Sequence, residues 1–325
     1  MKKKINYRDK IIWDNCEELY DKIFKYKIKE DYNFYKSSFC KVMTIKLGNS
    51  KIFLKLLKEK KNSKKIFYFR RNDEFQVSKL YAEKKNIVVK KYKLNYSILI
   101  YKIVNFFLEN LTYENNYKKN TILFVRNRTK YQKIFDMCAS TMNKKYNFIY
   151  YNNILKILTS HKLKFQAKKK TDLEKKLLIS NLEGIYGILI IKKLLNNYLS
   201  EIKPKAIISV EGDSLEHSVM AYISKNKYKT YCFQWGSFVK KNDIKNGFKY
   251  MYQDKKFVWG PYYKKKFQEI NSDTNFIVAG NSLIKENYNS KKKDIVFLLN
   301  PNTPYIDDKT NKDFLHLVKW SKKFK

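Results

Sequence analysis

The chain has 325 residues and is 44% hydrophobic and 16% aromatic, which is enough apolar material for two cores and excludes a disordered polypeptide. Its formal net charge is +40 and its pI is near 9.8. Such a charge suggests nucleic acid as a partner, because clustered cations gain affinity by releasing counterions from phosphate backbones. However, few of the basic residues are arginine, whose forked contacts nucleic-acid proteins favour: Arg8, Arg70, Arg71, Arg126 and Arg128.

The remaining basic residues are lysines spread along the whole chain, and three explanations of them stay open. An AT-rich coding sequence would enrich Lys together with Asn, Ile and Tyr, and we favour this explanation over nucleic-acid binding. Lysines gathered on one face would also hold the protein against an anionic membrane surface, at about 1 kcal/mol per cation. The cysteines are far apart and form no CxxC pair, so they indicate neither a zinc site nor a disulfide framework and fit a reducing cytoplasm: Cys16, Cys40, Cys138 and Cys232.

Membrane insertion and export are not indicated. Residues 1–15 start with lysines but have no apolar stretch of signal-peptide length. The longest apolar tract, 96–111, is broken by polar residues and is shorter than the roughly 20 residues that span a bilayer. We expect a core or amphipathic helix there, with a membrane-surface role as the second interpretation. The expected location is the cytoplasm, or the periphery of the inner face of the cytoplasmic membrane.

The first half of the chain is predicted to hold lysine-rich helices and short strands. Short β-branched or aromatic runs predict strands at 65–69, 87–89, 121–125 and 148–151, and a helix is expected at 131–142. This βαβ rhythm predicts parallel strands with helices on the sheet faces.

One long amphipathic helix is expected over 172–202. Thr171 or Asp172 can cap it, and Pro204 stops it. Gly184 and Gly187 fall within this helix, and we interpret them as sites of close helix–helix contact.

The second half is where the backbone turns sharply, because all four prolines and seven of the eight glycines lie at or beyond residue 184. Strands are predicted at 206–210, 230–235, 256–260, 276–280 and 294–300, and helices at 215–225, 261–270 and 313–323. We divide the chain into a lysine-rich α/β region (1–115), a Rossmann-like region (116–285) and the start of a C-terminal domain (286–325).

Each strand predicted between 206 and 300 ends in a polar or glycine-bearing turn: EGDS, QWGS, WGP, GNS and NPN. Ligands of open α/β sheets bind outside the carboxyl ends of the strands. In EGDSLEH, Glu211 and Asp213 are candidate general bases, weighed equally against roles in the turn, and Ser214 is a helix cap. Glu216 and His217 follow, and a single helical histidine is more often packed or solvated than catalytic.

The stretch KPKAIISVEGDSLEHSVMAYISKNKYKTYCFQWGSF, followed by DKKFVWGPYYKKKF and FIVAGNSLI, resembles bacterial surface-polysaccharide (capsule or lipopolysaccharide) glycosyltransferases of the GT-B superfamily. Members of that group show a strand ending in Gln-His-Gly, one ending in Trp-Gly, and a Gly-Asn turn before the donor-binding domain. The resemblance covers roughly 80–120 residues. It implies an α/β, GT-B-like fold, with a Rossmann-like doubly wound parallel sheet and a second Rossmann-like domain that is incomplete here.

The candidate catalytic residues are Glu211 and Asp213, and the turns provide a set of candidate substrate-binding residues. This set is Gly212, Ser214, His217, Gln234, Trp235, Gly236, Ser237, Trp259, Gly260, Gly280, Asn281, Ser282 and Asn300. No Asp-x-Asp motif calls for a metal, and no cofactor is expected beyond the nucleotide-sugar co-substrate. Trp235 stands where related glycerophosphotransferase-type enzymes carry histidine, so a base at that position is not carried over.

We therefore expect a glycosyltransferase that moves a sugar from a nucleotide-sugar donor to a surface polysaccharide or lipid-linked glycan acceptor. Only one helix is expected after Asn300, so the donor domain looks truncated or reduced. Two alternatives stay open: a non-catalytic lysine-rich module that binds nucleic acid or an anionic glycan, and an inactive transferase remnant. Nucleic-acid binding would weaken steeply with salt, whereas transfer should depend on Glu211 or Asp213.

Overall fold

The computed structural model describes residues 5–92, 97–114, 120–125, 132–142, 145–160, 162–166, 169–210, 214–234, 250–271 and 273–280. Asn6–Leu283 form one compact unit, which contains the elements below apart from the first residue of the first helix. The strand expected at 294–300 and the helix expected at 313–323 lie outside the described residues.

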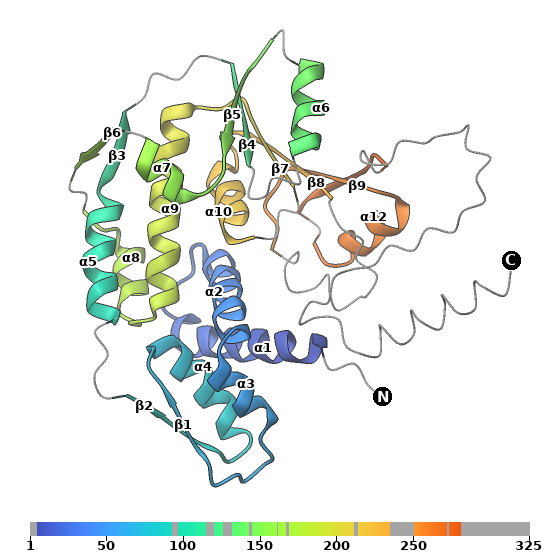
Figure 1. Ribbon diagram of the computed structural model, residues 1–325. Helices are drawn as coiled ribbons and strands as arrows, with labels where there is room; N and C mark the ends of the chain where they lie inside the picture. Colours follow the sequence, from blue (N-terminus) through green and yellow to red (C-terminus); the bar gives the residue numbers. More distant parts are fainter. Residues whose placement is uncertain are drawn as a thin grey trace, which may run out of the picture. The chain divides into compact units, whose positions relative to one another are not determined.

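A six-stranded parallel sheet forms the centre of this unit (Figure 1). Its strand order is β10-β9-β8-β7-β4-β5. The sequence predicted all six strands to within a few residues, since each is a short β-branched or aromatic run. They are β4 (Thr121–Val125), β5 (Asn147–Tyr151), β7 (Ala206–Val210), β8 (Lys229–Phe233), β9 (Lys255–Val258) and β10 (Asn275–Val278).

Helices cover both faces of the sheet, so the expected doubly wound, Rossmann-like α/β arrangement is confirmed. Residues of β4 and β7 alternate between the faces: Ile122 and Ile208 pack with α6 (Gln132–Met142), and Leu123 and Ile207 pack in the larger core on the other face. That core also contains residues of α10 (Leu215–Ser224). On β9 and β10 a smaller core includes Phe267 of α12 (Pro261–Gln268), whose ring stacks on a strand residue.

The N-terminal part adds helices and a separate two-stranded parallel sheet. Its elements are α1 (Ile5–Phe24), α2 (Tyr32–Gly48), α3 (Lys51–Lys58), β1 (Ile66–Phe69), α4 (Asn72–Glu83) and β2 (Val88–Lys91). The predicted strands here are confirmed, but among the described strands β1 pairs with β2 alone and does not join the central sheet. Residues of α1 to α4 share one continuous core with α9 and with one face of the central sheet.

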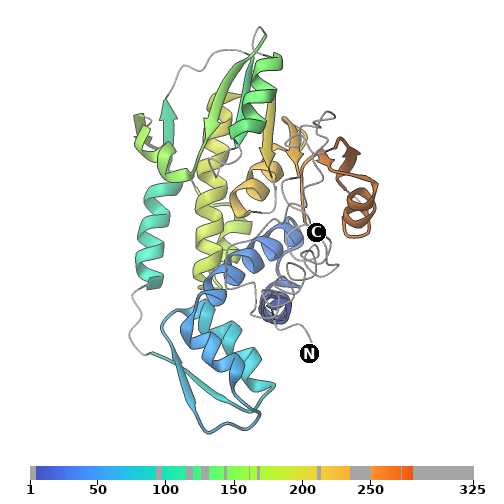
Figure 2. The ribbon, with the colours of Figure 1, turned by 45° about the vertical axis from the view of Figure 1, so that its right-hand side comes forward.

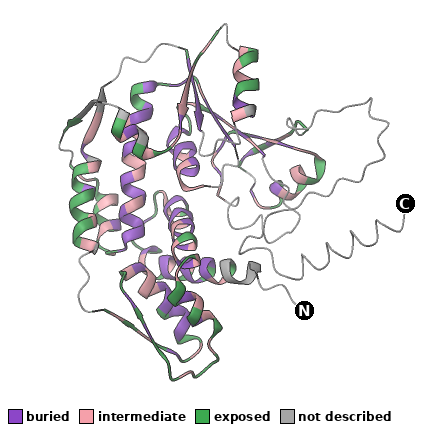
Figure 3. Cartoon of the chain, in the orientation of Figure 1, coloured by how far each residue is buried: buried purple, intermediate pink, exposed green. Residues whose placement is uncertain are grey.

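Twelve residues of the helix α9 (Glu183–Ile202) are buried (Figure 3). It packs against α2, α4, α5 (Ser97–Glu109), α7 (Ile154–Ser160) and α10, and against β3 (Leu111–Glu114), which pairs antiparallel with β6 (Lys162–Phe165). Figure 2 shows α5 alongside α9 from a second direction. In the described ranges, no helix has the length and apolar character needed to cross a bilayer.

The single helix predicted over 172–202 is wrong, because the chain breaks it into α8 (Asp172–Leu178) and α9. Asn181 has φ 52°, a left-handed conformation that ends the first helix. Thr171 caps α8 in a capping box with Glu174, as one of the two predicted caps. Gly184 lies just after the break, and a Cβ there would be 3.2 Å from the Phe39 ring of α2, which confirms the close helix contact expected at this glycine. A Cβ at Gly187 would meet no atom within 4 Å, so the contact expected there is wrong.

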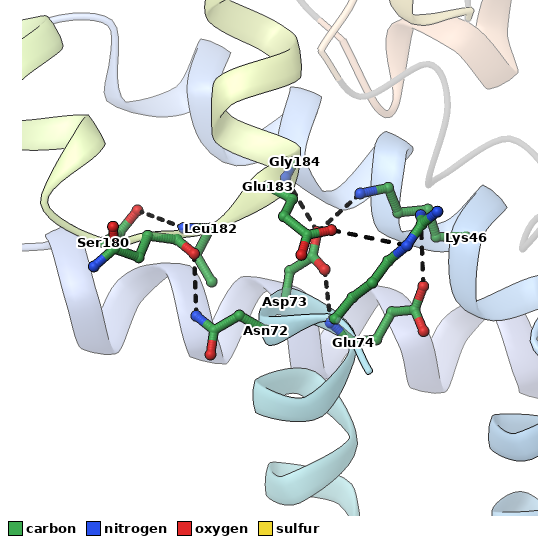
Figure 4. Close-up of polar contacts among 10 residues, drawn as sticks. Lys46, Asn72, Asp73, Glu74, Ser180, Leu182, Glu183 and Gly184 are labelled. Atoms are coloured by element: carbon green, nitrogen blue, oxygen red, sulfur yellow. Dashed lines mark hydrogen bonds and ion pairs between the residues drawn. The ribbon is translucent and has the colours of Figure 1, made fainter. Parts of the chain in front are cut away.

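The buried carboxylate of Asp73 joins α4 to α2 and α9 (Figure 4). Its Oδ2 accepts from Lys46 Nζ at 3.0 Å and from the Gly184 backbone N at 3.1 Å, and its Oδ1 accepts from the Glu74 N at 2.9 Å. The side chain is fully buried. A carboxylate is favourable here because unpaired amides of two helix N-termini, those of α4 and α9, point to it.

A second polar cluster ties the start of α2 to the middle of α9 and the end of α10. Lys192 Nζ donates to Asp31 Oδ2 at 3.1 Å and to Tyr35 Oη at 3.0 Å, and it lies over the rings of Tyr35, Phe34 and Tyr222. The Tyr222 hydroxyl donates to Asp31, and burial together with this carboxylate raises the tyrosine pKa. These contacts hold the N-terminal helices against α10.

We predict that Asp73→Ala lowers the free energy of unfolding by about 3 kcal/mol, because it leaves the Lys46 ammonium and the Gly184 amide without their shared acceptor. Urea unfolding followed by circular dichroism measures the change. Asp172→Ala is the control, since Asp172 also pairs with a lysine but is 87% exposed, and its unfolding midpoint should stay close to wild type. Equal losses in the two variants would contradict the role given to Asp73.

Candidate functional site

The strand order reverses between β4 and β7, with four strands on one side of this point and two on the other. After β4 the chain adds β5 on one side, and it then returns to add β7, β8, β9 and β10 on the other side. In open α/β sheets, ligands bind in the crevice outside the carboxyl ends of the two strands at which the order reverses. The carboxyl edge of β4 and β7 is therefore the candidate site, and α10 begins there (Figure 1).

The first turn of α10 begins at a serine cap. Ser214 has extended backbone angles, and its Oγ accepts from the His217 backbone N at 3.4 Å, which confirms the predicted cap. His217 is only 3% exposed, so its ring lies in the interior next to this cap. A helix start at the end of a parallel strand concentrates backbone N–H groups at the carboxyl edge.

Glu216, also in the first turn of α10, is paired with a tyrosine from the far side of β4. Tyr151 is the last residue of β5, it is 2% exposed, and its hydroxyl donates to Glu216 Oε2 at 2.5 Å. Burial raises the pKa of Glu216, and the Tyr151 hydrogen bond lowers it by less, so the net shift is upward. A carboxyl group shifted in this direction is closer to the pH range in which a general acid or base works.

A buried lysine from the N-terminal part reaches the same helix turn. Lys41 of α2 is 7% exposed, and its Nζ donates to the Ser218 Oγ of α10. The contact joins residues 177 positions apart in the sequence. A cation and a helix N-terminus at one sheet edge are the groups that stabilise phosphate oxygens.

The turns after β8 and β9 are fixed to one another. Gln234 Oε1 accepts from the Trp259 backbone N, and the Gln234 carbonyl accepts from the Trp259 indole Nε1, both at 3.0 Å. The Gln234 backbone N donates to Phe257 O at 2.9 Å. Gln234 is 3% exposed, so the structure shows this predicted substrate-binding side chain as the support of the next turn.

Two glycines follow β9 and β10 at the same edge. Gly260 precedes α12, where Pro261 takes the first helical position as predicted. Gly280 has φ +73°, a conformation that favours glycine, and it follows β10. A Cβ at either glycine would meet no atom within 4 Å, so neither position is enclosed by the described part of the chain.

The other predicted site residues lie outside the described residues. These are Glu211, Gly212, Asp213, Trp235, Gly236, Ser237, Asn281, Ser282 and Asn300. Among the residues that the structure describes, no three His, Cys, Asp or Glu side chains come together as a metal site would need.

Sequence reasoning missed Tyr151 and Lys41 and assigned Glu216 no role. Tyr151 had a usable signal, because it ends a predicted strand at the edge where ligands bind. Glu216 stood among the acids of EGDSLEH, but nothing local marked it as buried or paired. Lys41 is one lysine among many, and only the packing of α2 on α10 distinguishes it.

No protein-family model, curated protein or solved structure matches the chain. Function is therefore inferred from the chain's own strand order, from the groups at the carboxyl edge, and from the motifs in its sequence.

We predict that wild type loses stability relative to Glu216→Gln as the pH rises from about 4 to about 7. Because the folded state has the higher pKa, protonation of Glu216 stabilises the folded protein. This contribution to stability is fully present below the unfolded-state pKa and is lost as the pH rises through the folded-state pKa. The glutamine does not titrate. Urea unfolding of both proteins at several pH values measures the difference, at about 1.4 kcal/mol for each unit of pKa shift.

Tyr151→Phe provides the second measurement. It removes the hydrogen bond that lowers the Glu216 pKa, so the titration of Glu216 should move to higher pH. Carboxyl carbon chemical shifts report that titration directly by NMR. A stability difference between wild type and Glu216→Gln that stays constant with pH would show that burial does not shift this carboxyl.

Proposed function

We propose that this chain is a GT-B-type glycosyltransferase that moves a sugar from a nucleotide-sugar donor to a hydroxyl of a surface polysaccharide or lipid-linked glycan. The observation that carries the proposal is the Glu216–Tyr151 pair, which brings a carboxyl with a raised pKa to the point where the strand order reverses. Lys41 at the same helix turn adds a buried cation.

The positions of the motif residues support the same proposal. The residues that carry the resemblance to surface-polysaccharide glycosyltransferases follow successive strands: Gln234 comes after β8, Trp259 and Gly260 after β9, and Gly280 after β10. In a parallel sheet these strand ends share one edge. Motifs that lie far apart in the sequence can therefore contribute to one binding surface.

The reaction needs a base for the acceptor and stabilisation of the leaving phosphates. The acceptor oxygen bonds to the anomeric carbon while the bond from that carbon to the phosphate oxygen breaks, and the nucleotide leaves with the electron pair, as a diphosphate from UDP- and GDP-sugars or as a monophosphate from CMP-sugars. The acceptor proton passes to a carboxylate, for which Glu211 and Asp213 are our candidates, with Glu216 as the third. The N-terminus of α10 and the Lys41 ammonium stabilise the negative charge on the phosphates, so no metal is required by this scheme.

The proposed location is peripheral, on the inner face of the cytoplasmic membrane. A lipid-linked acceptor is held there, and a protein with a formal net charge of +40 is attracted to anionic lipid headgroups. The nucleotide-sugar serves as co-substrate, and the scheme uses no other cofactor.

We predict that replacing the essential carboxylate lowers the transfer rate at least a hundredfold, because general-base catalysis contributes about 10²–10⁴. Glu211→Gln, Asp213→Asn and Glu216→Gln are assayed separately. UDP-, GDP- and CMP-sugars are offered with a membrane lipid extract as acceptor, and release of the free nucleotide is measured. Glu269→Gln is the matched control, since Glu269 forms a surface pair with Lys266 on α12 and its loss should leave the rate unchanged.

Two outcomes would overturn the proposal. One is that no nucleotide-sugar is consumed by the wild-type chain. The other is that all three carboxylate variants transfer sugar at the wild-type rate. Retention of activity by Glu211→Gln and Asp213→Asn, with loss only in Glu216→Gln, would instead move the base to the residue paired with Tyr151.

A further inference from the structure

The helix α5 presents an unusual number of large apolar side chains to solvent. We define the α5 surface as the exposed apolar residues of this helix together with one phenylalanine of β6, each 39% to 57% exposed. They are Leu99, Ile100, Ile103, Val104, Phe106, Phe107 and Phe165. Figure 3 shows the outer side of α5 as exposed. Scattered exposed apolar residues are ordinary, but a contiguous group of this kind marks an interaction site.

In α5 the large apolar side chains face outward and a polar side chain faces the protein. Asn105 is 1% exposed, whereas its neighbours Val104 and Phe106 are exposed. Tyr101, Asn105 and Leu108 are spaced for one helix face and are the less exposed side chains. Since α5 packs along α9, this face is the one turned to the protein. The helix expected within 96–111 is thus confirmed as α5, and the exposure of its outer side shows that it is not a fully buried core helix.

The aromatic part of the α5 surface is continuous between two elements. The ring centroids of Phe106 and Phe107 lie 5.7 Å apart, and those of Phe106 and Phe165 lie 5.8 Å apart. Phe165 belongs to β6, which pairs with the strand that follows α5. The apolar area is therefore a broad face supported by a helix and a strand, and it is not a single protruding side chain.

The charges around this face fit an anionic bilayer. Lys102 is exposed between the apolar residues of α5, and Lys164 is exposed next to Phe165. The only acidic residue of α5 is Glu109, at its C-terminal end. Helices that lie in the membrane interface combine an apolar face with basic residues in this way. A second copy of the chain is a poorer occupant, because each copy carries a formal net charge of +40 and would bring lysines against lysines.

We propose that the α5 surface docks on an anionic lipid bilayer, with α5 lying in the plane of the headgroups and its phenylalanine rings inserted among the acyl chains. The helix has 13 residues and does not span the bilayer. Apolar burial supplies part of the binding free energy, and attraction between lysines and lipid phosphates supplies the rest. The inference stands apart from the proposed transferase activity, since docking involves neither donor nor acceptor.

Vesicle flotation of the full chain tests the proposal. The chain should bind vesicles of phosphatidylcholine with about 30% phosphatidylglycerol at least tenfold more tightly than vesicles of phosphatidylcholine alone. Phe107→Glu should weaken binding to the anionic vesicles at least tenfold, since it removes an inserting ring and adds a repelled charge. Met137→Glu is the matched control: Met137 is a 50% exposed residue of α6, outside the α5 surface, and its change should stay within about twofold.

A second pair of variants separates the charge contribution. Lys102→Gln should weaken binding about fivefold, the equivalent of one lost lysine–lipid attraction, whereas Lys265→Gln on α12 should have little effect. Circular dichroism confirms that each variant is folded, which is expected because the changed side chains are exposed. Equal binding by wild type and Phe107→Glu would overturn the proposal.

The same variants identify the competing occupant. If a second copy covers the α5 surface, light scattering in the absence of lipid should show a dimer that Phe107→Glu converts to a monomer, and the membrane proposal fails. No nucleotide-sugar is present in these measurements, so the two proposals fail independently. If the chain transfers no sugar but still binds vesicles through Phe107, the transferase proposal is overturned and the membrane-docking proposal stands.

Discussion

The Asp73 carboxylate is the interaction on which the placement of the other elements depends. It accepts hydrogen bonds from a backbone amide at the start of α9 and from the ammonium of Lys46 in α2, and Asp73 itself lies in the first turn of α4. One buried charge thus fixes where three helices meet, and full burial makes the loss of any partner costly. Gly184 completes the joint, since its missing side chain lets α9 approach the Phe39 ring of α2.

From the Asp73 contact, α9 extends both toward the carboxyl edge of the central sheet and along the helix that carries the α5 surface. On one side it packs against α10, and its Tyr198 lies against Tyr151, the partner of Glu216. On another it supports α5, whose outer face is apolar. The Lys192–Asp31–Tyr222 cluster and the Lys41–Ser218 contact add two further ties between α2 and the α9–α10 pair. The N-terminal helices are therefore part of the structure around the carboxyl edge.

Local patterns were sufficient for most elements and failed where two consecutive residues interrupted a helix. The strands of the central sheet and the caps at Thr171 and Ser214 were predictable, because β-branched runs and capping side chains act over a few residues. The break between α8 and α9 was missed, since the amphipathic pattern continues through it and only the left-handed Asn181 and the extended Leu182 interrupt the helix. The sequence predicted the turns that contain Gln234 and Trp259, but it did not predict the contact between them.

The sequence by itself determined the α/β class, the identity and direction of the successive strands, and the carboxyl edge as the place for polar turns. Those properties follow from side-chain periodicity and turn chemistry, which are local. The tertiary structure alone decided the strand order and the pairing of Tyr151 with Glu216 across β4. It also decided the contact of Lys41 with α10 and the outward direction of the apolar face of α5. Each of these depends on contacts between distant residues, and the free energy of such contacts leaves no mark in the neighbouring sequence.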